Sequence, residues 1–172
     1  MKRKRASAGA PGAAPFDFVG MSCPCCYRPG GARSLFCGER ACAPDDAPKK
    51  LAGLRALMRE CGVAAYVVPS EDAHASEYVA AADERLSWLT GFTGSAGVAL
   101  VTETHALLWT DARYFLQAAE QLGAGWTLMK MYEPGVPELH EWVASALRPG
   151  DAVGVDGALV SAARAREWLH GA

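Results

Sequence analysis

A chain of 172 residues has room for about one domain, and a hydrophobic content of 51% is ample for a packed core. No apolar run approaches the ~18–20 residues that a membrane-spanning helix needs. The net charge of −2 conceals an asymmetry, because residues 1–50 carry +5 and residues 51–172 carry −7. The acidic part lacks the basic face that nucleic-acid binding requires, so we expect neither a nucleic-acid partner nor a membrane partner.

Residues 1–47 show no sustained apolar periodicity, and we expect them to form a mostly disordered, low-complexity extension. The opening run MKRKR is typical of a nuclear-import patch or the start of a transit peptide, but such short runs are more often solvated charge. No hydrophobic signal core is seen, so disulfides are not expected.

Five of the six cysteines lie in this extension: Cys23, Cys25, Cys26, Cys37 and Cys42. Their spacing, C-x-C-C followed by C-x4-C, fits zinc modules only in part, and no histidine precedes His74. A zinc site in this extension stays open as an alternative, while Cys61 lies on an apolar helical stripe and is interpreted as a packing residue.

From residue 48 the pattern changes, and helices alternate with strands. Apolar residues recur at helical spacing after Pro48, which can open a helix, until Gly62 ends it. A strand over Val63–Val68 follows, and Asp83 is expected to cap a short helix with Leu86 and Leu89 inward. The elements expected next are strands over Val98–Val101 and Ala106–Trp109 joined as a hairpin, a helix over Ala112–Leu122, a strand over Trp126–Met131, a helix over Pro137–Leu147, a strand over Val153–Val155 and a helix over Ala162–Leu169.

This alternation predicts an α/β fold with a mixed β-sheet flanked by helices. We expect two parts, the extension at residues 1–47 and a domain at residues 48–172. The sequence ends inside or just after a helix with no closing strand. We therefore expect the domain to be incomplete at its C-terminus and the sequence to be a fragment.

The loop GFTGSAG places Gly91, Gly94 and Gly97 at every third position. A phosphate-binding loop needs a strand before the glycines and a helix after them, whereas here a strand follows. We interpret the glycines as residues that permit a tight turn. The chain also lacks a G-x-S-x-G nucleophile elbow and an H-E-x-x-H metal motif, so no self-sufficient catalytic centre is predicted.

His74 lies between Asp72 and Glu77, just after a predicted strand end, where α/β proteins often place functional groups. The three residues do not keep the i, i+4 spacing of a helical metal-ligand pair. A hydrogen-bonded surface loop and a functional loop both remain open here.

Arg113 is expected in the first turn of a helix, where the backbone already carries partial positive charge. Thr110 or Asp111 can cap that helix, which leaves other N–H groups and the guanidinium as a small anion-binding centre. An arginine that extends over the surface, or that pairs with a nearby acid, explains the pattern equally well.

Two long stretches closely resemble the N-terminal domain of the cytosolic Xaa-Pro aminopeptidases, in the creatinase/prolidase or "pita-bread" group. They are AAYVVPSEDAHASEYVAAADERLSWLTGFTGSAGVALV and HALLWTDARYFLQAAEQLGAGWTLMKM. EWVASALRPGDAVGVD continues the resemblance, which covers the chain from about Leu51 to its end. The resemblance implies enzymes that release the first residue of a peptide whose second residue is proline. Two metal ions, typically Mn²⁺, share a water or hydroxide that attacks the scissile carbonyl.

In that family the metal ligands, two Asp, one His and two Glu, lie in a C-terminal domain. The resemblance therefore implies neither a catalytic residue nor a metal ligand in this chain, which we expect to be inactive alone. The N-terminal domain adds a wall of the active-site cleft and part of a homodimer. Arg113 matches an arginine that contacts the peptide, Glu77 matches a glutamate near the same cleft that suits a free amino group, and His74 matches a neighbouring histidine.

A cytoplasmic location follows from the same resemblance. An alternative of a different class is a non-catalytic interaction or dimerisation module, a short isoform that regulates full-length subunits. A further alternative adds a metal-binding head at Cys23–Cys42 to that module.

Overall fold

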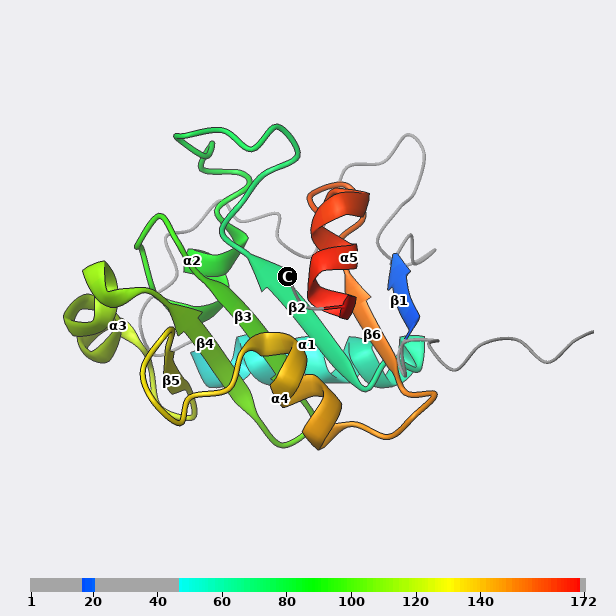
Figure 1. Cartoon of the computed structure of the whole chain (residues 1–172). Coiled ribbons are helices and arrows are strands. Elements are labelled where there is room, and N and C mark those ends of the chain that lie inside the picture. Colours follow the sequence, from blue (N-terminus) through cyan, green and yellow to red (C-terminus); the bar gives the residue numbers. More distant parts are fainter. Residues whose placement is uncertain (1–16, 21–46, 171–172) are drawn as a thin grey trace, which may run out of the picture.

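The structure is a computed structural model and describes residues 17–20 and 47–170. Within these residues six strands form one mixed sheet in the order β1-β6-β2-β3-β4-β5 (Figure 1). The strands are β1 (Asp17–Gly20), β2 (Ala65–Pro69), β3 (Val98–Thr102), β4 (Ala106–Thr110), β5 (Thr127–Lys130) and β6 (Ala152–Val155). The helices are α1 (Ala47–Cys61), α2 (Arg85–Thr90), the 3₁₀ helix η2 (Ala112–Tyr114), α3 (Phe115–Gln121), α4 (Leu139–Ala146) and α5 (Ala162–His170).

Strand β3 runs antiparallel to its neighbours β2 and β4, whereas the other neighbouring strands pair in parallel. The carboxyl ends of β2, β4, β5 and β6 therefore meet at one edge of the sheet, the upper edge in Figure 1, together with the start of β3. The connections at this edge include residues 71–84 after β2, residues 91–97 before β3, and residues 111–114 after β4. Loops at the carboxyl ends of parallel strands are where α/β folds commonly place binding groups.

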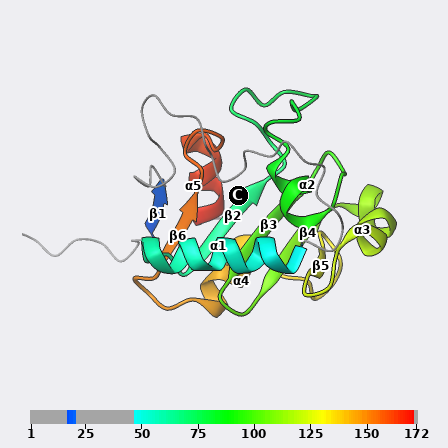
Figure 2. The ribbon, with the colours of Figure 1, turned by 180° about the vertical axis from the view of Figure 1, so that it is seen from behind.

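The central strands alternate side chains between two cores, as a sheet covered on both faces requires. In β2, Tyr66 and Val68 pack on one face, and Ala65 and Val67 pack on the other. Helices α1 and α2 cover the first face and α4 and α5 the second, as the two opposite views show (Figures 1 and 2). Helix α1 buries a stripe at helical spacing, made of Leu51, Leu54 and Met58.

Several predictions from the sequence are confirmed. The mixed α/β sheet is present, and helix α1 is followed by Gly62, whose φ of 68° is the left-handed conformation typical after a helix end. The hairpin of β3 and β4 is antiparallel as expected. The two predicted inward leucines of α2, Leu86 and Leu89, are 2% and 0% exposed.

Other predictions are wrong in detail. Asp83 does not cap α2, because the helix begins at Arg85, and it is the backbone oxygen of Asp83 that accepts the Arg85 N–H at 2.7 Å. The helix predicted over Ala112–Leu122 is divided into η2 and α3, because Tyr114 adopts φ −117° and ψ 3°, outside helical geometry. Strand β1, which pairs in parallel with β6, lies within the extension that is expected to be mostly disordered, and most of that extension is outside the described residues.

The stretch Cys23–Cys42 and the run MKRKR lie outside the described residues. Among the residues described, no helix has both the length and the apolar content needed to cross a bilayer.

Candidate functional site

The glycine loop at residues 91–97 forms the centre of the upper edge. Gly91 ends α2 with a φ of 80°, a left-handed conformation that glycine adopts without steric cost, so the turn itself requires this glycine. Gly94 and Gly97 do not have positive φ and are needed for space instead. A Cβ at Gly94 would lie 2.8 Å from Cε2 of the buried Phe92 ring, and one at Gly97 would lie 3.2 Å from the backbone oxygen of Trp109. The turn interpretation is therefore correct for one glycine of the three.

The ends of the neighbouring strands hold this loop from both sides. The Ser70 N–H donates to the Gly97 oxygen at 3.0 Å, and the Gly97 N–H donates back to Ser70 Oγ at 3.2 Å. On the other side, the buried Thr110 hydroxyl donates to the Ala96 oxygen at 2.6 Å. The loop is therefore fixed relative to the carboxyl ends of β2 and β4, and so are the groups that it carries.

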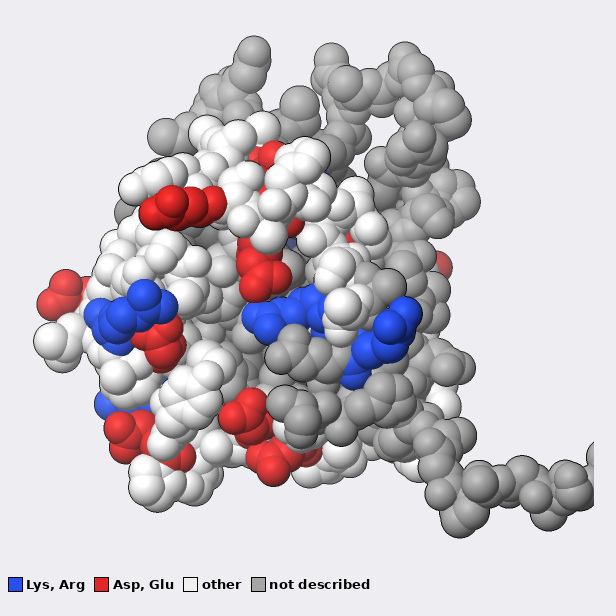
Figure 3. Space-filling model, turned by 45° about the horizontal axis from the view of Figure 1, so that its top comes forward, with Lys and Arg blue, Asp and Glu red and all other residues white. Residues whose placement is uncertain are grey.

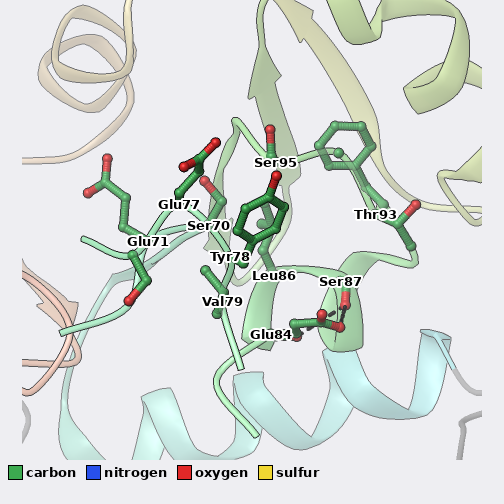
Figure 4. A pocket seen from close by; sticks show the side chains of 13 residues that line it. Ser70, Glu71, Glu77, Tyr78, Val79, Glu84, Leu86, Ser87, Thr93 and Ser95 are labelled. Atoms are coloured by element: carbon green, nitrogen blue, oxygen red, sulfur yellow. Dashed lines mark hydrogen bonds between the residues drawn. The ribbon is translucent and has the colours of Figure 1, made fainter. Parts of the chain in front are cut away.

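A cavity of about 290 Å³ lies between this loop, α2 and the connection at residues 71–84. Its walls combine the apolar side chains of Leu86 and Phe92 with the carboxylates of Glu71, Glu77 and Glu84. Glu71 and Glu77 lie on one side and Thr93 on the other, as Figure 4 shows. The remaining lining residues are Ser70, Ser76, Tyr78, Val79, Ser87, Gly94 and Ser95. A pocket with apolar walls and several carboxylates suits a ligand with a cationic group.

The connection at residues 71–84 is anchored at its start by Asp72. This residue is 6% exposed, and its Oδ1 accepts the backbone N–H groups of His74 at 3.0 Å and Ser76 at 2.9 Å. These hydrogen bonds, with that from Ser76 foremost, hold the pKa of Asp72 below its ordinary value. Glu77 is exposed and lines the cavity, whereas His74 is exposed and does not line it.

Arg113 lies outside the cavity, at the carboxyl end of β4. Asp111 is the N-cap of η2, and its Oδ1 accepts the Arg113 backbone N–H at 3.0 Å. The same carboxylate accepts the guanidinium through Nε at 2.9 Å and Nη2 at 2.7 Å. The guanidinium holds the pKa of Asp111 below its ordinary value, and the carboxylate in turn raises the pKa of Arg113. The pairing with a nearby acid is therefore the alternative that the structure supports, and the backbone N–H of Arg113 is already used.

Tyr114 connects Arg113 to the cavity. The Arg113 guanidinium carbon lies 5.2 Å from the centre of the Tyr114 ring, a cation–π distance. The ring packs edge-to-face on Phe92 at 5.9 Å and 83°, and its hydroxyl lies 2.7 Å from the hydroxyl of Ser95, which lines the cavity. Neither Tyr114 nor Ser95 was singled out from the sequence, because no spacing rule shows that these two hydroxyls meet.

The upper edge thus carries charges of both signs close together. Figure 3, which turns this edge toward the viewer, shows basic and acidic side chains interspersed on it. The structure brings Glu77 to the cavity wall and Arg113 to the neighbouring surface, whereas His74 stays outside both. In the described part of the chain, no group of three or more His, Cys, Asp or Glu side chains converges as a metal site would require.

Residues 50–171 match the family model of the creatinase/prolidase N-terminal domain. The chain belongs to this family. Among curated relatives of this creatinase/prolidase N-terminal domain, aminopeptidase P2 of Arabidopsis thaliana is 51% identical over 121 residues, which is 69% of this chain and 17% of that protein. A probable Xaa-Pro aminopeptidase P of Tuber melanosporum (strain Mel28) is 52% identical over 121 residues, covering 70% and 20% respectively.

Among solved structures, the X-prolyl aminopeptidase of Caenorhabditis elegans superposes on this creatinase/prolidase domain with a TM-score of 0.66 and 39% identity, over 71% of this chain and 22% of that one. That protein is described as a cytosolic enzyme with a di-nuclear active site. The resemblance inferred from the motifs is confirmed. The chain spans a fifth or less of the length of the two curated relatives named above.

Proposed function

We propose that this domain forms one wall of the peptide-binding cleft of an Xaa-Pro aminopeptidase and that the hydrolytic groups belong to a different domain. The observation that carries the proposal is that a cationic and an anionic side chain, Arg113 and Glu77, lie at the same edge of the sheet without pairing with each other. Arg113, whose side chain is 68% exposed, lies beside a cavity whose wall includes Glu77. Tyr114 and Ser95 connect the two.

The chemistry of the substrate explains why such a wall is useful. The nitrogen of the bond before proline carries no hydrogen, so an enzyme cannot bind it through the backbone N–H hydrogen bond that peptidases use with other extended peptides. Recognition then depends on the free amino group and on oxygen atoms of the peptide. Glu77 suits the protonated amino group, and Arg113 suits a carbonyl or carboxylate oxygen. His74 is proposed as a neighbouring contact with the same peptide.

The metal requirement of the family does not fit these residues. The resemblance implies two Mn²⁺ ions, which supply the attacking hydroxide when bound. Asp72, the most buried acid of the loop, is engaged by two backbone N–H groups, and the described residues offer no convergent ligand set. We propose that the ions are held by a second domain and that this chain does not hydrolyse peptides alone.

A cytoplasmic location and a homodimer are part of the same proposal. Three large side chains stand exposed and are available for contact between copies: Tyr78 at 85%, Leu116 at 84% and Tyr132 at 78%. Sedimentation analysis of the purified chain tests self-association directly, and a monomer at all concentrations would oppose a dimer formed by this domain.

A chimera tests the substrate role. Residues 50–171 replace the matching segment of the C. elegans enzyme, and the chimera is assayed with the peptide Arg-Pro-Pro. Arg113→Ala is expected to lower kcat/KM roughly 5- to 150-fold. This corresponds to a loss of ~1–3 kcal/mol in transition-state stabilisation, the scale of a hydrogen bond to a charged group.

The matched control is Arg59→Ala. Arg59 is also exposed and pairs with Glu103 at 2.7 Å, but it lies at the end of α1, beside the β3–β4 turn and away from the upper edge. The kcat/KM of this variant should stay within about two-fold of the parent chimera, because losing a surface ion pair changes the free energy by only about 0–1 kcal/mol. Equal kinetics for both variants would refute the role of Arg113.

A further inference from the structure

The Arg113 guanidinium is fixed on two sides by its own neighbours in sequence. Asp111 accepts two of its hydrogen bonds, from Nε at 2.9 Å and from Nη2 at 2.7 Å. The Tyr114 ring lies 5.2 Å from the guanidinium carbon. An arginine has five N–H donors, so this pairing uses two of them and leaves three, including both on Nη1. The fork formed by Nη1 and Nη2 is thus still available to an incoming oxygen.

The two hydrogen bonds that hold the guanidinium, which we call the clamp, and the helix cap share the carboxylate of Asp111. Oδ1 of Asp111 accepts both the backbone N–H and the Nε of Arg113. The orientation of the side chain is therefore tied to the start of η2, which follows directly from β4. The carboxylate also offsets the repulsion between the cation and the helix start. A long, exposed side chain that would otherwise sample many rotamers is held in one direction.

We propose that Asp111 is a positioning residue, which holds the Arg113 guanidinium ready to bind a carbonyl or carboxylate oxygen of the peptide. This inference rests on the proposed role of Arg113. Binding normally costs the ordering of a flexible side chain, and a clamp removes most of that cost before the ligand arrives. Asp111 thus acts through Arg113 and need not touch the peptide.

Two other roles for Asp111 give different experimental results. If the carboxylate serves only as a helix cap, its charge is not needed, because asparagine caps helices as well as aspartate does. If the carboxylate competes with the peptide for Arg113, its removal should strengthen peptide binding. The variant Asp111→Asn separates both from positioning, because it keeps the capping oxygen and loses the charged clamp.

The first measurement uses the full 172-residue chain. In ¹⁵N NMR spectra, the Nε–H proton of Arg113 should exchange with water more slowly than those of other exposed arginines, because it donates to Asp111. Asp111→Asn should speed this exchange at least about three-fold. The Arg59 Nε–H is the internal control, because that arginine pairs with Glu103 through Nη1. An Arg113 Nε–H exchange rate that does not change in Asp111→Asn would overturn the clamp.

The second measurement is the kinetics of the same chimera with Arg-Pro-Pro. Asp111→Asn is expected to raise KM roughly 2- to 12-fold, the range for ordering one long side chain, with kcat within two-fold of the parent. Asp111→Ala should raise KM similarly and also lower the melting temperature, because it loses the cap. A KM that falls, or that rises only in the alanine variant, would overturn positioning.

The two proposals fail in different ways. If Arg113→Ala lowers kcat/KM while Asp111→Asn has no effect, the proposed function stands and the inference about Asp111 is refuted. If Arg113→Ala has no effect, the role of Arg113 is refuted, and the positioning role of Asp111 with it.

Discussion

Replacing Gly94 with alanine tests whether the glycine loop is built around the Phe92 ring. Phe92 is fully buried, and a Cβ at residue 94 would lie 2.8 and 2.9 Å from its two Cε atoms, with Cζ closer still. The ring cannot swing away freely, because Tyr114 packs against it at 5.9 Å. The clash must therefore be relieved by a shift of the loop or of the core, and overpacking of this kind costs about 1–3 kcal/mol.

The assay is urea unfolding of the 172-residue chain. With a slope of roughly 2 kcal/mol/M, Gly94→Ala should lower the midpoint by about 0.5–1.5 M. Gly53→Ala is the matched control, because Gly53 is exposed in the middle of α1 and a Cβ there meets nothing within 4 Å. That variant should be more stable by about 0.5–1 kcal/mol, since alanine favours a helix interior over glycine.

A double variant identifies the partner of the clash. Phe92→Leu removes the ring atoms that the new methyl group would meet, so Gly94→Ala should cost at least ~1 kcal/mol less in that background than in the parent chain. The reasoning is refuted if Gly94→Ala is as stable as the parent, or if its cost is the same in both backgrounds.

Two further changes follow from backbone strain and from charge. Tyr132 is 78% exposed and has a φ of 68°, a left-handed conformation that asparagine tolerates better than tyrosine. Tyr132→Asn should therefore stabilise the chain by about 0.5–1 kcal/mol in the same urea assay. The control is Tyr78→Asn, at an exposed residue without positive φ, which should change stability by less than ~0.5 kcal/mol. The pKa of Asp72 is lowered in the folded chain, so the ionised carboxylate stabilises the fold. This stabilisation is fully present above pH 3.8, the ordinary pKa of the group, and is lost as the pH falls through the lower pKa of the folded state. The urea midpoints of the parent and of Asp72→Asn should therefore converge below about pH 4, and a constant difference from pH 7 to pH 2 would contradict this.

Local patterns predict much of the fold because several elements agree with their own sequence. The stripe of α1 repeats at helical spacing and stops at a glycine, and the paired apolar runs of β3 and β4 are separated by a short polar turn. Strand β1 could not be found in this way, because its four residues gain their partner from β6, more than a hundred residues later. The break at Tyr114 also escapes periodicity, since the residues around it keep a helical pattern.

The site was less predictable than the fold. Arg113 stood out at a predicted helix start and Glu77 in the loop around His74, but only the resemblance gave either residue a role. Their spacing in sequence does not show that they share an edge of the sheet. Their placement at one edge depends on tertiary packing, as the meeting of the Tyr114 and Ser95 hydroxyls beside the cavity illustrates. The pairing of Arg113 with Asp111 is local, but the spacing of these two residues fits an anion-binding helix start equally well, and only the side-chain geometry decides between them.

The most direct test of the central claim compares the same residues with and without a catalytic domain. The purified 172-residue chain and the chimera with the C. elegans enzyme are each incubated with Arg-Pro-Pro and Mn²⁺, and released arginine is measured. We expect the chimera to release arginine and the chain alone to release none. Proline-directed cleavage by the isolated chain, lost when Arg113 is replaced, would contradict it.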